Sequence, residues 1–169
     1  MMLEKFTLIF TMIILGIDPG TTRIGWALLR TGKKSIKPID YGCLEISEKS
    51  QGQRLEIIDK NIKLLIKKYK PSVIAVEKIF FFKNAKTVMS ISEARGVIIL
   101  IAQKNRLKCI ELTPLEIKQN LIGYGRAKKK DVQKTIQCFF SLEKMPKPDD
   151  IADALAVALA GINKIRDKK

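Results

Sequence analysis

The chain has 169 residues, a length that suits one domain with a sizeable core. Its 32 Lys and Arg residues against 17 Asp and Glu residues give a formal net charge of +15, which favours a polyanionic partner such as nucleic acid. Because the chain has no histidine, Ser-His-Asp catalysis, Cys-His catalysis and histidine-ligated zinc are excluded, and any chemistry must come from carboxylates and lysines.

The first eleven residues resemble a signal peptide in part, because a charged start precedes an apolar stretch. No small-residue cleavage site follows, and the apolar stretch is too short to span a membrane. We therefore interpret residues 1–11 as an N-terminal extension or a misassigned start, with Met12 as the alternative first residue. The three cysteines, Cys43, Cys109 and Cys138, are isolated from one another, which is typical of a reducing compartment, so we expect a cytoplasmic protein.

Apolar runs in the first part of the chain predict three antiparallel strands, over residues 12–17, 24–30 and 35–46. Apolar residues at spacings of three and four then predict a helix over residues 51–70, which Pro71 ends. The wholly apolar run 73–76 is typical of a central parallel strand that is covered on both faces.

The second part of the chain alternates helices with one more strand. We expect a long helix over 84–105 and a strand over 108–112, and then a short helix with Thr113 as its N-cap and Pro114 at its first position. Further helices are expected near 131–140 and over 149–164. This order predicts an α/β fold, with a mixed five-stranded sheet that carries helices on both faces. We assign one domain over residues 12–164 and a basic tail over 165–169.

Four acidic residues stand where a catalytic site would form. Asp18 and Glu77 each end an apolar strand, and Asp150 and Asp153 lie one turn apart on the last helix. Parallel strands would bring the first two to one edge of the sheet, and converging carboxylates repel one another unless cations lie between them. Two Mg²⁺ ions held there could hydrolyse a phosphodiester bond without histidine.

Each acid also has a simpler interpretation when it is taken alone. Asp18 could make the Asp-Pro-Gly turn, and Asp149 and Asp150 could cap the last helix. Glu77 is harder to explain in this way, because an acid at the end of a buried strand is costly without a partner. Taken together the pattern favours a metal site, and we assign only Asp149 as a cap.

Five segments in order resemble the RuvC family of bacterial Holliday junction resolvases. They are GIDPGTTRIGWALL, IAVEKIFFFKNAKT, EARGV, IKQNLIGYGRAKKKDVQ and DDIADALAVALA, and the resemblance extends from about Met12 to Ile162. It implies an RNase H-like fold and a homodimer that nicks two strands of a four-way DNA junction symmetrically, with a metal cofactor. It also implies that the protein acts in partnership with the RuvAB branch-migration machinery. The catalytic acids of the family fall on Asp18, Glu77, Asp150 and Asp153, with Mg²⁺ as the expected metal and Mn²⁺ as a substitute.

The resemblance also assigns DNA-binding residues. Phe80 is expected to stack on unpaired bases at the junction centre, although core or dimer packing is the alternative for such an aromatic. Residues 118–134 carry six basic residues and one acidic residue, and Lys118 and Lys129 match functional lysines of the family. The predicted DNA-binding residues are Phe80, Lys83, Lys118, Arg126, Lys128, Lys129 and Lys130. The long helix over 84–105 could form the dimer interface or pack in the monomer core.

Three other functions remain open on the sequence. Actin-like ATPases also begin with a strand followed by Asp-x-Gly-Thr-Thr, but they need two such domains, for which 169 residues are too few. A junction-binding protein without catalysis would have no need of clustered acids near phosphate. A nuclease of the same fold could act on RNA or on another DNA intermediate, because fold does not fix function.

Overall fold

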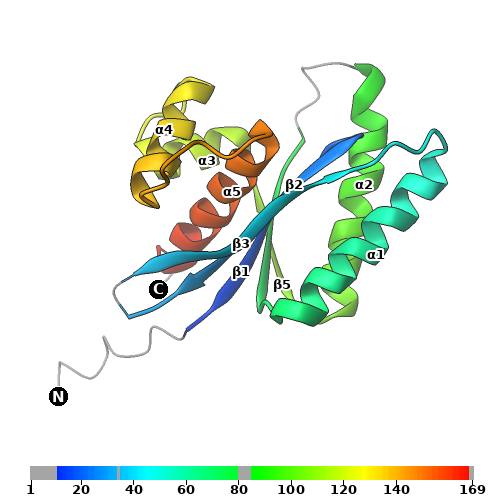
Figure 1. Ribbon diagram of the computed structural model, residues 1–169, viewed down its shortest axis with the longest axis horizontal. Coiled ribbons are helices and arrows are strands. Elements are labelled where there is room, and N and C mark those ends of the chain that lie inside the picture. Colours follow the sequence, from blue (N-terminus) through cyan, green and yellow to red (C-terminus); the bar gives the residue numbers. More distant parts are fainter. Residues whose placement is uncertain (1–10, 34, 80–84, 168–169) are drawn as a thin grey trace.

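The computed structural model describes residues 11–33, 35–79 and 85–167. Five strands form one sheet in the order β3-β2-β1-β4-β5, and five helices cover it (Figure 1). The strands are β1 (Ile13–Asp18), β2 (Arg23–Thr31), β3 (Ile36–Glu45), β4 (Val73–Glu77) and β5 (Lys108–Leu112). The helices are α1 (Gln51–Tyr69), α2 (Ala85–Lys104), α3 (Pro114–Ile122), α4 (Lys129–Phe139) and α5 (Asp149–Arg166).

The sheet is mixed, as the sequence predicts. β1 pairs antiparallel with β2, and β2 pairs antiparallel with β3. β1 and β4 are parallel, with Ile17 opposite Val76, and β4 and β5 are also parallel. The parallel β1–β4 pair brings Asp18 and Glu77 to the same edge of the sheet, which confirms the expectation that the two strand-ending acids are neighbours.

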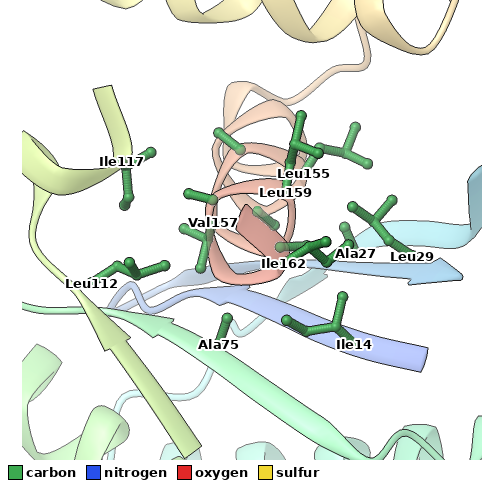
Figure 2. Packing of buried hydrophobic residues seen from close by; sticks show 14 of the residues in the cluster. Ile14, Ala27, Leu29, Ala75, Leu112, Ile117, Leu155, Val157, Leu159 and Ile162 are labelled. Atoms are coloured by element: carbon green, nitrogen blue, oxygen red, sulfur yellow. The ribbon is translucent and has the colours of Figure 1, made fainter. Parts of the chain in front are cut away.

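Each face of the sheet has its own apolar core. Helices α1 and α2 cover one face, and α3, α4 and α5 lie on the other (Figure 1). Helix α5 lies at the centre of its face, and eleven of its residues are buried. This burial explains why the helix is apolar on all sides. Figure 2 shows Leu155, Val157, Leu159 and Ile162 of this helix packed over the strands. The predicted five-stranded α/β fold with helices on both faces is therefore confirmed.

Only one side of the long helix α2 packs in the core. Ile98 and Ile101 are buried in the core on this face of the sheet, so the expectation of core packing holds for them, and Val88 is buried as well. Met89 is 69% exposed and Leu100 is 52% exposed. A Cβ added at Gly96 would meet no atom within 4 Å. One face of α2 thus remains open in the single chain.

Several predicted boundaries need correction. Helix α4 begins at Lys129 rather than 131, because the Lys128 amide donates to the Asp131 carboxylate and this bond starts the helix two residues earlier. Helix α5 continues to Arg166, two residues beyond the predicted end. The predicted start of α3 is confirmed, since Thr113 caps it in a reciprocal bond with Glu116. Within the residues that the structure describes, no helix is long and apolar enough to cross a bilayer.

Candidate active site

The alternation of side chains along the strands brings Asp18 and Glu77 to one face of the sheet. Successive residues of a strand point to opposite faces, so Asp18 shares its face with Ile14, and Glu77 shares its face with Ala75. Ile14 and Ala75 both pack in the core beneath α5 (Figure 2). Both acids therefore lie on the side of the sheet that α5 covers, and at the edge where that helix begins.

Two glycines let α5 come close enough to add its own acids. A Cβ on Gly16 of β1 would lie 2.5 Å from the carbonyl oxygen of Ala154, and 2.6 Å from the Cβ of Ala158. A Cβ on Gly25, the residue opposite Asp18 in β2, would lie 2.5 Å from the carbonyl carbon of Asp150 and closer still to its oxygen. The helix backbone thus rests directly on the strands, and its first turn carries Asp150 and Asp153 over Asp18.

The carboxyl groups of Asp18 and Glu77 share a hydrogen bond in a largely desolvated position. Burial raises the pKa of Asp18 well above its usual value, and the negative charges of Glu77, Asp153 and Asp150 raise it further. Burial also raises the pKa of Glu77, although the hydrogen bond with Asp18 partly offsets the effect. The ionisation of Asp18 is therefore coupled to that of Glu77, and the negative charges around Asp18 make it harder to ionise.

Lys129 is the cation closest to this group among the residues that the structure describes. Its ammonium lies 2.9 Å from an oxygen of Asp153 and 3.5 Å from an oxygen of Asp149. Burial raises the pKa of Asp153, and Lys129 offsets part of that rise. Partial burial lowers the pKa of Lys129, but the hydrogen bond and the charge of Asp153 outweigh it, so the net shift is upward. Lys129 therefore stays charged and neutralises part of the site.

Asp149 does not cap α5, contrary to the prediction. The N-cap is Pro148, and no side chain there bonds to the helix amides. Asp149 is instead the first helical residue, and its exposed carboxylate lies near Lys129. An acid in the first turn still suits the positive end of the helix dipole, so the residue type fits the position without a capping bond.

Arg23 is a site residue that the sequence analysis missed. Its Nε lies 3.4 Å from Oδ2 of Asp150, an enclosed oxygen that accepts no hydrogen bond. Gly16 and Gly25 were missed in the same way, although a glycine inside a strand pattern is a signal for close backbone approach. That signal was present in the sequence, whereas nothing local to Arg23 indicated its partner.

The four carboxylates are suited to a hard divalent cation, and without one they repel one another. Carboxylate oxygens are the ligands that Mg²⁺ prefers, and a cation would relieve the repulsion that raises the pKa of Asp18. In the described ranges, no three acidic or cysteine side chains are already gathered closely enough to hold an ion. Lys129 and Arg23 lie against two of the acids instead, so binding would require these side chains to turn.

The remaining predicted cations border the site to different degrees. The charge of Lys118 in α3 acts on Glu77 and offsets a small part of the rise in the pKa of that carboxyl. Arg126, Lys128 and Lys130 are exposed on the segment that leads into α4 and on its first turn. Phe80 and Lys83 lie outside the described residues.

The likeness to known proteins covers most of the chain. A family model described as crossover junction endodeoxyribonuclease RuvC matches residues 14–161. The protein of that description from Petrotoga mobilis is 47% identical over 148 residues, which cover 87% of this chain and 91% of the relative. The one from Fusobacterium nucleatum is 43% identical over 158 residues, which cover 93% of this chain and 83% of the relative.

Solved structures agree with the sequence comparison. Thermus thermophilus RuvC is similar with a TM-score of 0.86 at 25% identity, over 93% of this chain and 97% of that one. The same protein in complex with a Holliday junction substrate gives a TM-score of 0.86 at 26% identity, over 93% and 96%. These matches confirm the RNase H-like fold that the resemblance implied. With a family model that spans nearly all of its elements, and relatives above 40% identity, the chain belongs to the RuvC family of crossover junction endodeoxyribonucleases.

Proposed function

We propose that this chain is a structure-specific endonuclease, which resolves four-way Holliday junctions by symmetric, metal-dependent phosphodiester hydrolysis during recombination and repair. The observation that carries the proposal is the convergence of strand-ending Asp18 and Glu77 with Asp150 and Asp153 of α5. Membership of the RuvC family supports a DNA junction as the substrate. The net charge of +15 supports a polyanion.

The four acids are the proposed metal ligands, with Mg²⁺ as the metal and Mn²⁺ as a substitute. Two bound ions would supply an activated water and a stabilised leaving oxygen. The acids stand on regular elements, since two end strands and two belong to a helix packed on glycines. Lys129 and Arg23 pair with Asp153 and Asp150, so two of the four acids already face a positive charge.

The DNA strand is proposed to pass between α3 and the start of α4. Lys118, Arg126, Lys128, Lys129 and Lys130 all belong to these segments, and their charges would neutralise phosphates on either side of the acids. When a phosphate and metal enter, Lys129 can exchange Asp153 for a phosphate oxygen, because its ammonium is half exposed. Phe80 and Lys83 are proposed DNA contacts on the family resemblance alone.

A homodimer is proposed on the open face of α2. Met89 and Leu100 expose apolar side chains there, and Gly96 leaves room for a neighbouring helix to approach closely. Two copies related by a two-fold axis would present two sites, as symmetric nicking requires. We also propose, from the family resemblance, that the protein acts in partnership with the RuvAB branch-migration complex. A cytoplasmic location agrees with the three free cysteines.

The test is a cleavage assay on a labelled synthetic four-way junction, with several mobile core sequences, in Mg²⁺ and in EDTA. Plain duplex, single-stranded DNA and RNA are the competing substrates. We expect paired nicks in the junction alone, and only with Mg²⁺. Cutting of RNA or of plain duplex would identify another nuclease of this fold, and tight binding without cutting on any core would identify a binding protein.

The variant Asp18→Asn tests, in the same assay, whether the acids act in cutting. It should abolish cutting and keep junction binding, while Asp59→Asn, which changes a half-buried acid of α1 that pairs with Lys63, should cut normally. In EDTA at neutral pH, Asp18→Asn should also melt a few degrees higher, about 1 kcal/mol, because it removes a carboxyl with a raised pKa that opposes folding when ionised. That gain should vanish below the unfolded pKa of about 3.9, where both states are protonated.

A further inference from the structure

The turn between α3 and α4 is held by hydrogen bonds along its backbone. Gly123 ends α3 with a positive φ of 76°, and its amide donates to the carbonyl of Gln119. The amide of Ala127 donates to the carbonyl of Tyr124 at 3.2 Å, and Ala127 itself is buried. The amide of Lys128 then bonds to the first turn of α4. The turn therefore has a defined conformation.

This turn holds a large aromatic side chain in solvent. Tyr124 is 58% exposed, and Leu115, whose side chain packs against Gly125, is 56% exposed. Neither residue belongs to the apolar cores on the two faces of the sheet. Because the backbone here is fixed on both sides, the exposure of Tyr124 belongs to the fold and does not arise from a loose segment.

The position of Tyr124 relates it to the acids. It follows Lys118 by six residues and precedes Lys129 by five, and the charges of both lysines act on the carboxylate group. Five residues of chain reach about 18 Å at most, so Tyr124 lies within that distance of Lys129, a span of about five nucleotides of one DNA strand. Arg126 is two residues away. An aromatic side chain interleaved with cations is the pattern with which proteins hold single-stranded nucleic acid.

We infer that Tyr124 stacks on a base of the DNA strand that crosses the site, and so helps to position the phosphate that is cut. The inference rests on the proposed function. The surrounding cations favour a polyanion as the occupant, and of the polyanions only nucleic acid also offers flat apolar faces. Tyr124 would act as a positioning residue, because its ring touches a base and not the reacting atoms.

The experiment compares Tyr124→Ala, Tyr124→Leu and Tyr124→Phe, with Tyr41→Ala as the matched control. Tyr41 is an exposed tyrosine on the edge strand β3, away from the acids. Junction and single-strand binding are measured in EDTA over a range of salt, and cutting is measured in single turnover with Mg²⁺. A junction with 2-aminopurine beside the cut reports stacking, because its fluorescence is quenched against an aromatic ring.

We expect Tyr124→Ala and Tyr124→Leu to weaken DNA binding and slow cutting about tenfold, with the salt dependence unchanged because no phosphate contact is lost. Tyr124→Phe should behave as the parent, and the 2-aminopurine quenching should disappear only when the ring is removed. Normal binding and cutting by Tyr124→Ala would overturn the inference, and so would full activity of Tyr124→Leu. If the parent binds DNA but does not cut junctions, the proposed function fails while the binding comparison still decides the role of Tyr124. A parent that binds no DNA overturns both.

Discussion

Gly25→Ala should separate the two halves of the active site. The methyl group would point from β2 into the first turn of α5, 2.5 Å from the carbonyl carbon of Asp150. Carbon atoms pack at about 3.5–4.0 Å, so helix and strand must part by about 1 Å. The obstacle is helix backbone, which cannot turn aside as a flexible side chain does. Asp150 and Asp153 would therefore move away from Asp18 and Glu77.

The expected magnitudes follow from that displacement. Overpacking of a tight interface costs about 1–3 kcal/mol, so the unfolding free energy should fall by about 2 kcal/mol and the melting temperature by about 6 °C. A displacement of about 1 Å at a catalytic group can cost about 100-fold in rate. Single-turnover junction cutting should therefore fall about 100-fold, while junction binding in EDTA falls far less, because the lysines of α3 and α4 are untouched.

The control is Gly52→Ala in α1. A Cβ there would meet only the Ser50 hydroxyl, at 3.9 Å, so cutting and stability should stay close to those of the parent. Near-normal cutting by Gly25→Ala would refute the argument that close approach of α5 to β2 builds the site. Loss of cutting and binding together, with an unfolded protein, would show only that the glycine is needed for folding. Assaying Gly25→Ala again at a low temperature where it is folded would then separate the two effects.

Three further changes test other parts of the structure. Lys129→Ala should slow cutting about 100-fold and reduce the salt slope of junction binding by about 1, and an unaltered slope with normal cutting would assign the lysine to a solvated face. Glu116→Gln should destabilise the protein by about 1 kcal/mol at neutral pH, an amount discounted for exposure, because the ammonium of Lys164 and the backbone amide of Thr113 donate to this carboxyl and lower its pKa to about 2. The difference in stability between the parent and Glu116→Gln should have its full size above about pH 4.5 and disappear as the pH falls to about 2. A difference in melting temperature that does not depend on pH would contradict this prediction. Leu100→Glu should dissociate the proposed dimer in sedimentation, while Leu64→Glu, equally exposed on α1, should not.

Local patterns in the sequence predicted the order of the elements correctly, and with it the meeting of Asp18 and Glu77 at one edge of the sheet. Apolar runs that stop at Asp18 and Glu77 can be recognised without a structure, because the period of a strand and the length of an apolar run are local properties. The parallel pairing of their strands then follows from the helix that separates them. The same reasoning placed Asp150 and Asp153 on one helix face, from their spacing alone.

Contacts between elements were less accessible from the sequence. The start of α4 was predicted two residues late, which hid the fact that Lys129 stands at the helix N-terminus beside Asp153. Asp149 was assigned as a cap, yet Pro148 takes that position. Arg23 gave no local sign of its contact with Asp150, because the two residues are joined only through the packing of α5 on β2.

The sequence by itself determined the fold class, the choice of the four candidate acids and the basic character of this protein. Each of these depends on residue type and on spacing along the chain. Only the tertiary structure decided how near the acids stand, which cations hold them and which aromatic remains exposed. Those features depend on distances between segments far apart in the chain, such as the backbone contact of Gly25 with Asp150. Such distances result from the packing of the whole core, and no local pattern encodes them.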